Sequence, residues 1–302
     1  MRAFLVVPAL AATLLGSCSE AKTNQPEGLA IATAADPVTS AKEQGKKGKK
    51  GKGDDIDNLT KVGKMKEVPE SSGLALTGEP GTFYTHGDDG NQPILYKVDA
   101  KGEVLARIEV PVKSRDWESV TRDNVGNVYI GDVGNNNNNR KDLVIHRLNP
   151  LNPQIVQEIQ LKYPDQNEFP PKKKDRNFDV EASLWHAGQV YLFTKDRGEG
   201  KTSKVYTVPD QAGNYTARLQ TKLAINGQVT DAALSPNGRR LVLLAREELF
   251  VFEGDDLAAI LKAAPRRISL KGVGQTEGAV FTTDQTLYIS TEQGNLFTYQ
   301  FE

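Results

Sequence analysis

Five short segments of the sequence each begin with an acidic or hydroxyl side chain that small and apolar residues follow. Their first residues are Ser72, Glu118, Glu181, Asp231 and Glu277. If the fold brings these positions to one level, four carboxylates lie near one another. Their mutual repulsion then raises their pKa values unless a cation lies among them. The sequence therefore predicts an acidic ring that needs a neutralising partner.

Two kinds of cation could neutralise such a ring. One belongs to the protein, because Lys195, Arg246 and Arg115 lie near the ends of apolar segments, and it predicts a structural salt-bridge network. The other is Ca²⁺, which takes six to eight oxygen ligands. The expected Ca²⁺ ligands are Glu118, Asp132, Asn135 and Glu181, with help from Asn136 and backbone carbonyls. Both interpretations stay open on the sequence alone.

The stretch 115–140 holds the densest group of polar candidates, including the asparagine run that follows Gly134. Asparagine tolerates left-handed backbone, so this run is either a long turn or a loop that contacts a ligand. His86 lies at a strand end beside Asp88. The residues predicted to contact a ligand are Ser72, His86, Asp88, Asp116, Glu118, Asp132, Asn135, Asn136, Arg140, Glu181, Lys195, Asp231, Arg246, Glu277 and Glu292.

Several kinds of catalytic site lack their motifs. The three histidines fall in different segments and no HExxH pair occurs, which argues against zinc. His146 and His186 are expected on strand surfaces. No Gly-x-Ser-x-Gly sequence is present. Carboxylate pairs across a ring could serve acid–base chemistry, while Trp117 and Trp185 are expected to pack between repeats, with carbohydrate stacking as the alternative.

The elements that position these side chains are short strands in a repeating order. Each acidic segment is followed by two further apolar runs with alternating polarity, bounded by Gly, Asn, Asp and Pro. The first residues of the five segments are 46, 63, 50 and 46 positions apart by subtraction. This period predicts an all-β propeller with five blades. Six blades remain an alternative if residues 148–177 hide a degenerate repeat.

Three further elements complete the predicted domain, residues 58–302. The last repeat lacks a fourth strand, so the N-terminal run Leu59–Val68 is expected to complete it and close the ring. The long interval contains a proline-rich insertion, 163–177, which predicts a protruding loop. The segment 255–264 predicts one short helix with Asp255 or Asp256 at its N-cap and Pro265 beyond its end.

The N-terminal residues resemble a bacterial lipoprotein signal. Arg2 precedes an apolar run, and Leu15-Gly16-Ser17 leads to Cys18, the single cysteine of the chain. The resemblance implies removal of residues 1–17 and lipid on Cys18, and Ser19 favours the outer membrane. An ordinary secretory signal is the alternative. Residues 18–57 are rich in Lys and Gly and predict a disordered tether, either a plain spacer or a segment that touches anionic headgroups.

Composition limits the partners. Net charge is −1 at pH 7, so nucleic acid is not expected as a partner. Membrane contact is expected through lipid on Cys18. A small molecule, glycan or protein is expected at the polar ring, and the domain is expected to be monomeric.

The repeats resemble those of a known group of proteins. The segments Trp117–Val120 and Asn127–Asn136, together with Arg140 and the related turns from about residue 60 to 302, resemble bacterial propellers of the phytase-esterase-like, NHL-repeat and SdiA-regulated groups. The resemblance implies propeller architecture and a metal candidate at the ring, and no particular reaction.

Three functions are consistent with these observations. The first is a non-enzymatic envelope propeller that binds a ligand or partner at its acidic ring, with Ca²⁺ as the candidate cofactor. The second is a Ca²⁺-dependent hydrolase of phosphoesters, lactones or sugars. The third is a structural scaffold for other envelope proteins, which predicts an exposed apolar patch.

Overall fold

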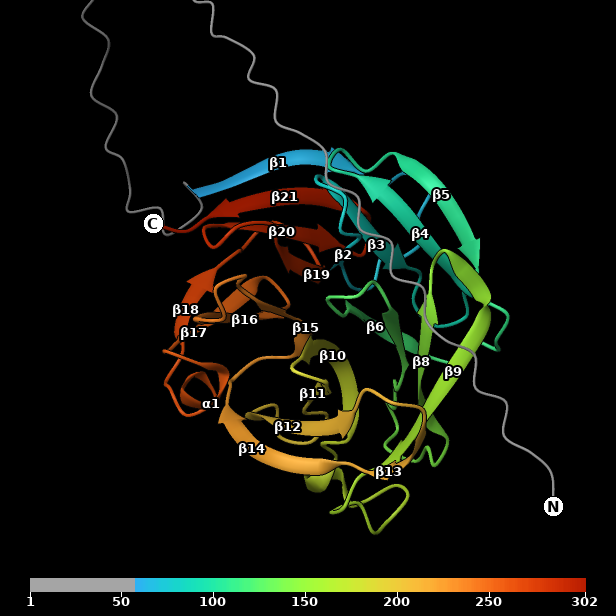
Figure 1. Cartoon of the computed structure of the whole chain (residues 1–302). Coiled ribbons are helices and arrows are strands. Elements are labelled where there is room, and N and C mark those ends of the chain that lie inside the picture. Colours follow the sequence, from blue (N-terminus) through green and yellow to red (C-terminus); the bar gives the residue numbers. More distant parts are fainter. Residues whose placement is uncertain (1–57) are drawn as a thin grey trace, which may run out of the picture. The chain divides into compact units, whose positions relative to one another are not determined.

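The computed structural model describes residues 58–302, which form five sheets of mainly antiparallel strands around a central axis (Figure 1). Each sheet is one blade, with its first strand beside the axis and its last strand at the rim. The prediction of a five-bladed propeller is confirmed, and the six-bladed alternative is wrong. The predictions for residues 1–57, including Cys18 and the tether, lie outside the described residues. Within residues 58–302, no helix is long and apolar enough to cross a membrane.

The strands follow one another from the axis outward in every blade. Blade 1 contains β2 (Ala75–Leu76), β3 (Thr82–His86), β4 (Ile94–Asp99) and β5 (Val104–Glu109). Blade 2 contains β6 (Trp117–Arg122), β7 (Val128–Asp132), β8 (Leu143–Asn149) and β9 (Asn152–Lys162). Blade 3 contains β10 (Asp179–His186), β11 (Gln189–Lys195), β12 (Thr202–Pro209) and β14 (Arg218–Ala224). Blade 4 contains β15 (Val229–Leu234), β16 (Arg240–Ala245), β17 (Glu248–Glu253) and β18 (Arg266–Ser269). Blade 5 contains β19 (Thr276–Phe281), β20 (Thr286–Thr291), β21 (Asn295–Gln300) and β1 (Leu59–Lys64).

The core consists of five clusters of apolar side chains, one at each interface between neighbouring blades. Because each blade is covered on both faces, the strands near the axis are apolar on both faces, as in β7, where every residue is buried. Rim strands such as β5 alternate between half-buried and exposed residues. Trp117 is buried between blades 1 and 2, and Trp185 borders the cluster between blades 2 and 3, so the interpretation of both as packing residues is confirmed.

The N-terminal strand closes the ring as predicted. β1 pairs with β21, from Leu59 opposite Tyr299 to Lys64 opposite Asn295. The backbone N–H of Lys64 also donates to the carbonyl of Lys101 in blade 1 at 2.9 Å. Met65 and Val68, which follow β1, are buried in the cluster between blades 5 and 1. The first described strand therefore joins the last blade to the first.

One strand was not expected from the sequence. β13 (Gly213–Thr216), in the connection between β12 and β14, pairs in parallel with residues 159–162 of β9 (Figure 1). Blade 2 therefore has a fifth strand that the chain of blade 3 supplies. The period of the repeats does not predict this pairing of β13 with β9, because β13 lies inside a connection between strands.

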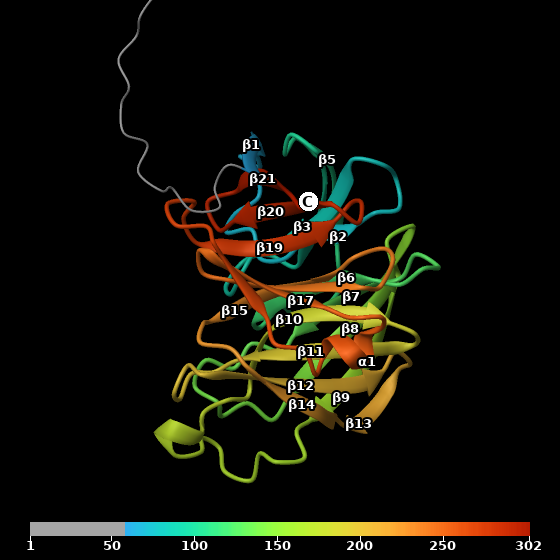
Figure 2. The ribbon, with the colours of Figure 1, turned by 90° about the vertical axis from the view of Figure 1, so that its left-hand side faces the viewer.

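The insertion and the helix lie where the sequence places them. Residues 163–178 project from the sheets as a loop with one 3₁₀ turn, η2 (Lys173–Asp175) (Figure 2). The helix α1 (Leu257–Ile260) is shorter than predicted, and the side chain of Asp256 accepts the N–H of Ala259 at 2.7 Å as its N-cap.

Candidate functional site

One backbone irregularity places the polar residues at the axis. In four blades the pairing between the two strands nearest the axis skips one residue of the inner strand, which is a β-bulge. The skipped residues are Glu118, Glu181, Thr230 and Glu277. The bridge between Ser71 and Gly87 gives Ser72 the same place in blade 1. These five positions surround one end of the axis, which we call the mouth.

The register corrects the predicted role of Asp231. The sequence alignment places Asp231 in the ring, but the bulge residue of blade 4 is Thr230, one position earlier. Asp231 instead accepts the backbone N–H groups of Ala232 at 2.8 Å, Ala279 at 2.7 Å and Leu74 at 3.3 Å. Its buried carboxylate thus ties blade 4 to blades 5 and 1, which is a structural role.

Three carboxylates gather on the side of the mouth that blades 1 and 2 form. Single oxygen atoms of Asp88, Asp116 and Glu118 all lie within 4.8 Å of one another. Glu118 is only 5% exposed, yet within residues 58–302 no N–H donor contacts its carboxylate, whose one polar partner is the carboxyl of Asp116. Burial and the surrounding acids raise the pKa of Glu118 well above its usual range. Burial also raises the pKa of Asp116 to about 6 and that of Asp88 above its usual value.

Blade 3 brings both acids and cations to the mouth. Glu181 pairs with Lys195 at 2.7 Å and with Arg197 at 2.6 Å, and Arg197 also contacts Asp179 at 2.5 Å. Burial raises the pKa of Glu181, and the two cations oppose that rise. This half of the mouth confirms the predicted salt-bridge network for Glu181 and Lys195.

The fifth blade contributes Glu277, whose pKa burial raises to about 7. Gln275 donates to its carboxylate at 2.7 Å, and Arg246 in turn donates to Gln275. Arg246 is exposed and reaches Glu277 only through this amide. Glu292, directly after β20, accepts a hydrogen bond from Gln293 at 3.0 Å and is one of the acids that raise the pKa of Glu277.

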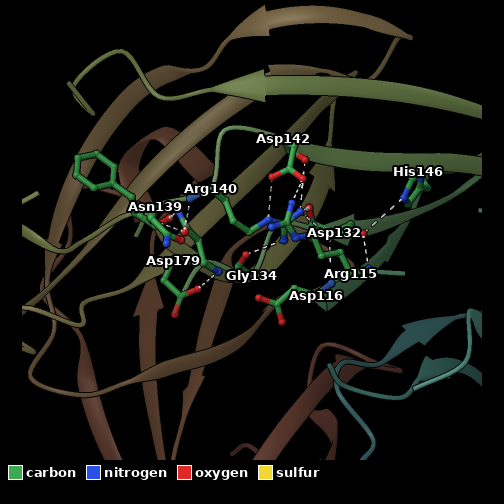
Figure 3. A network of polar contacts seen from close by, with 11 residues as sticks. Arg115, Asp116, Asp132, Gly134, Asn139, Arg140, Asp142, His146 and Asp179 are labelled. Atoms are coloured by element: carbon green, nitrogen blue, oxygen red, sulfur yellow. Dashed lines mark hydrogen bonds and ion pairs between the residues drawn. The ribbon is translucent and has the colours of Figure 1, made fainter. Parts of the chain in front are cut away.

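Asp132 does not face the mouth, in contrast to its predicted role as a metal ligand. Its Oδ1 accepts Arg140 Nη2 at 2.8 Å and the N–H of Asp116 at 3.2 Å, and its Oδ2 accepts the N–H of Arg115 at 2.9 Å (Figure 3). Both oxygens are occupied, because the chain before β6 wraps around them. Asp132 therefore fixes the backbone that carries Asp116 into the mouth.

Arg140 is likewise structural. Its side chain is 7% exposed and donates to Asp132, to the carbonyl of Gly134 at 2.7 Å and to Asp142 at 3.3 Å. The buried pair with Asp132 joins the end of β7 to the start of β8 (Figure 3).

The asparagine run is a turn in its buried part. Asn135 Oδ1 accepts the N–H groups of Asn139 at 2.8 Å and Arg140 at 2.9 Å, so Asn135 is a turn residue and not the predicted metal ligand. Asn138 adopts a left-handed backbone (φ 53°) and accepts the N–H of Phe178 at 2.9 Å. Asn136 is exposed. The run thus docks against the insertion before blade 3.

Two histidines lie deeper than the sequence indicates. His86 is fully buried, with Nδ1 2.8 Å from the carbonyl of Gly87 and its ring edge-on to Trp117, so a ligand at the mouth does not reach it. Burial lowers its pKa to about 4. His146, expected on a strand surface, is 3% exposed beside Trp117. Both fill the interface between blades 1 and 2.

Gly134 leaves the space that the carboxylates occupy. A β-carbon at this position would lie 2.7 Å from Glu118 Oε1 and closer still to the carboxylate of Asp116. Glycine is therefore required by the crowding of the acid cluster against the loop after β7. This contact fixes the position of Asp116 and Glu118 from a second side.

A comparison with family models decides the classification, because the model of the SdiA-regulated family matches residues 58–302. The chain belongs to the SdiA-regulated family. A search of curated proteins gave no significant match. The resemblance to this group, first seen in the repeats, is confirmed by the match.

Several solved structures resemble this SdiA-regulated protein at low identity. The PQQ-bound aldose sugar dehydrogenase from Streptomyces coelicolor is 11% identical with a TM-score of 0.50, covering 80% of this chain and 97% of its own. A putative gluconolactonase is 10% identical with a TM-score of 0.46, covering 80% and 91%. The virginiamycin B lyase from Staphylococcus aureus is 12% identical with a TM-score of 0.41, covering 77% and 66%. At such identities the similarity extends to the fold alone.

Two mouth residues of the SdiA-regulated domain were missed from the sequence, Asp179 and Arg197. A signal for the first exists, because Asp116-Trp117-Glu118 and Asp179-Val180-Glu181 share the pattern Asp-x-Glu at the same place in adjacent blades. Arg197 lies beyond the end of β11, where the chain has no repeat, and nothing in the sequence assigns it to Asp179.

Larger cavities of the domain lie away from the mouth. One of about 530 Å³ lies under the insertion, lined by residues such as Asp165, Phe178 and Lys204. Another of about 670 Å³ lies between β8, β9 and β13. Neither includes a carboxylate of the acid cluster.

Proposed function

We propose that the protein is a cell-envelope propeller whose mouth binds a hard divalent cation, Ca²⁺, and through it a ligand or partner. The observation that carries the proposal is the cluster of Asp88, Asp116 and Glu118, in which a buried glutamate lacks an N–H donor. Charged groups leave water only when something compensates them. Either shared protons or a bound cation supply that compensation here.

The spacing of the oxygens fits a shared ion. Ca²⁺–oxygen bonds are about 2.3–2.6 Å, so two ligands on opposite sides of one ion are about 4.6–5.2 Å apart. The three carboxylates, with oxygens within 4.8 Å of one another, meet this limit and provide hard oxygen donors. When bound, the ion would neutralise the cluster and offer Lewis acidity. Asp88, Asp116 and Glu118 would hold it, and Asp132 and Asn135 would not.

Thermal unfolding in Ca²⁺ tests the site. We expect residues 18–302 with Cys18→Ala to melt about 5–10 °C higher at a Ca²⁺ concentration 100 times Kd than in EDTA. The reason is that an ion bound only to the folded state raises the free energy of unfolding by about 2.7 kcal/mol at that concentration. Glu118→Gln is expected to abolish the shift, since it removes one of the three negative charges of the cluster and replaces a carboxylate by a neutral amide. Glu292→Gln, outside the cluster of Asp88, Asp116 and Glu118, is the matched control and is expected to keep the shift.

The pH dependence provides an internal check on this experiment. Burial raises the pKa of Asp116 from 3.8 to about 6 and that of Glu277 from 4.5 to about 7. In EDTA these two carboxyl groups bind more protons in the folded state than in the unfolded chain between about pH 4 and 7, so their contribution to the free energy of unfolding falls as pH rises through this window, while the lowered pKa of buried His86 contributes with the opposite sign. Ca²⁺ needs ionised carboxylates, so its shift in Tm grows with pH. No shift at about pH 8 would rule out the cation site.

The lipid anchor is a separate prediction. We expect the full-length chain in a bacterial host to fractionate with the outer membrane and Cys18→Ala to appear in the soluble envelope fraction, because Cys18 is the sole residue available for thioether lipidation. Radiolabelled palmitate should label only the chain with Cys18. Membrane retention of the Cys18→Ala protein would contradict the lipoprotein interpretation.

A hydrolase is the second candidate, and the raised pKa values favour it. Carboxyl groups with pKa values near 6 and 7, as for Asp116 and Glu277, suit general acid–base catalysis at neutral pH. Turnover of a chromogenic phosphoester, lactone or glycoside that requires Ca²⁺ and disappears in Glu118→Gln would establish it. If the protein binds these substrates but turns over none of them, the result supports the non-enzymatic function.

A further inference from the structure

The two halves of the mouth differ in charge. Asp88, Asp116 and Glu118 form a half with carboxylates alone. In the half that blade 3 forms, Lys195 and Arg197 neutralise Asp179 and Glu181. Besides neutralising these two acids, the cations place positive charge at the edge of the acid cluster.

Lys195 and Arg197 retain unused donors. An ammonium carries three N–H groups and a guanidinium five. Lys195 uses one contact to Glu181, and Arg197 uses Nε and Nη2 for Asp179 and Glu181. Within residues 58–302, Nη1 of Arg197 has no acceptor. The two side chains are 13% and 26% exposed, so water reaches them.

Both cations face the carboxylate half. Burial raises the pKa of Asp88 in blade 1 and of Glu277 in blade 5, and the ammonium of Lys195 opposes both rises. Burial lowers the pKa of Arg197, but nearby acids, including Glu118 in blade 2, raise it by more. Such interactions reach across the mouth, because the partners belong to different blades. A group at the centre would therefore meet the acids on one side and the cations on the other.

The balance of charge sets an order of binding. Six carboxylates, Asp88, Asp116, Glu118, Asp179, Glu181 and Glu277, face two cations, which leaves four negative charges by subtraction when all are ionised. This field repels an anion. A divalent cation in the acid cluster reduces the repulsion and leaves coordination positions on the solvent side, since Ca²⁺ takes six to eight oxygens.

We propose that the mouth recognises an oxyanion, a phosphate or carboxylate group, that bridges the bound cation and the free N–H groups of Lys195 and Arg197. This inference rests on the proposed cation site. The cation binds first and the oxyanion second. An oxyanion matches both halves, because its oxygens are hard ligands for the ion and strong acceptors for charged N–H donors.

Titration calorimetry with simple probes tests the inference. Phenyl phosphate and benzoate are titrated separately into residues 18–302 with Cys18→Ala, once in Ca²⁺ and once in EDTA. We expect at least one probe to bind in Ca²⁺ and neither in EDTA. The probe that binds identifies the oxyanion as phosphate or carboxylate. Equal binding in EDTA, or no binding in Ca²⁺, would overturn the proposal.

Variants assign the binding to the blade 3 cations. Lys195→Met is expected to weaken the probe by 10-fold or more while the Ca²⁺ shift in Tm persists. Arg246→Met is the matched control, because Arg246 is exposed at the equivalent strand end of blade 4, and it is expected to leave probe affinity unchanged. If Ca²⁺ raises the Tm of the parent protein but neither probe binds, the oxyanion site is refuted while the cation site remains supported. Absence of the Ca²⁺ shift refutes both.

Discussion

Deletion of Leu59–Val68 is expected to abolish cooperative unfolding of the domain. The deletion removes β1, which leaves β21 as an open edge, and it removes Met65 and Val68, which are 1% and 5% exposed. Loss of a large buried apolar side chain alone costs about 2–5 kcal/mol. With the lost strand pairing, the total is comparable to the whole stability of a domain, about 5–15 kcal/mol. Calorimetry and near-ultraviolet circular dichroism measure the outcome.

Deletion of residues 18–57 alone is the control for that experiment, and we expect it to leave Tm unchanged. A synthetic peptide of residues 58–68 added to the shortened chain is expected to restore a cooperative transition, since β1 contributes through pairing and burial. If the chain without Leu59–Val68 melts at the same temperature as the control, ring closure by β1 does not stabilise the fold.

Arg140→Met is expected to cost about 3–5 kcal/mol, because it leaves the buried carboxylate of Asp132 without its cation. For a domain of this size the loss corresponds to a fall in Tm of roughly 6–20 °C. The methionine fills much of the same volume, so the effect measures charge and hydrogen bonding more than packing. Differential scanning calorimetry of the unlipidated protein gives the value.

Arg115→Met is the matched control for Arg140→Met. Arg115 contacts the same neighbour, Asp142, but the two side chains are 61% and 52% exposed. An exposed ion pair contributes about 0–1 kcal/mol, so this variant is expected to melt within about 3 °C of the parent. If both substitutions lower Tm equally, the buried pair between Asp132 and Arg140 contributes no more to stability than the exposed pair of Arg115.

The fold could be predicted because it repeats. The spacing of the five segments that begin at Ser72, Glu118, Glu181, Asp231 and Glu277 predicted the number of blades, and the missing fourth strand of the last repeat indicated the role of β1. Each of these inferences depends on strand pairing that every blade shares. The pairing of β13 with β9 occurs only once among the described residues, so no repeated spacing in the sequence could predict it.

The site was harder to predict because one residue of register decides which side chain faces the mouth. Thr230 and Asp231 are adjacent, and both fit an alignment made by residue type. The bulge in blade 4 selects Thr230 and turns Asp231 toward three backbone N–H groups. Bulges depend on backbone twist and on the packing of neighbouring strands, neither of which the sequence displays.

The wrong metal ligands have a related cause. Asp132 and Asn135 stand at a strand end beside a glycine, where a ligand loop is expected, but their partners are backbone N–H groups of the same region and the guanidinium of Arg140. Asp179, 44 positions further along the chain, accepts the N–H of Asn135. A local sequence pattern cannot indicate an acceptor so far along the chain. The repeated Asp-x-Glu pattern at Asp116 and Asp179, in contrast, can be recognised in the sequence.

Closure of the ring by β1 also delays the completion of folding during synthesis of the chain. Lys64 and Asn295 pair directly, yet 231 positions separate them by subtraction. At roughly 5–20 residues per second, the ribosome needs about 10–50 s to make the partner of the first strand after that strand itself is complete. During this interval β1 has no strand partner, and the buried side chains of Met65 and Val68 that follow it have no blade to pack against. Escort by a chaperone, or passage across a membrane before folding, would therefore protect the chain until β21 exists.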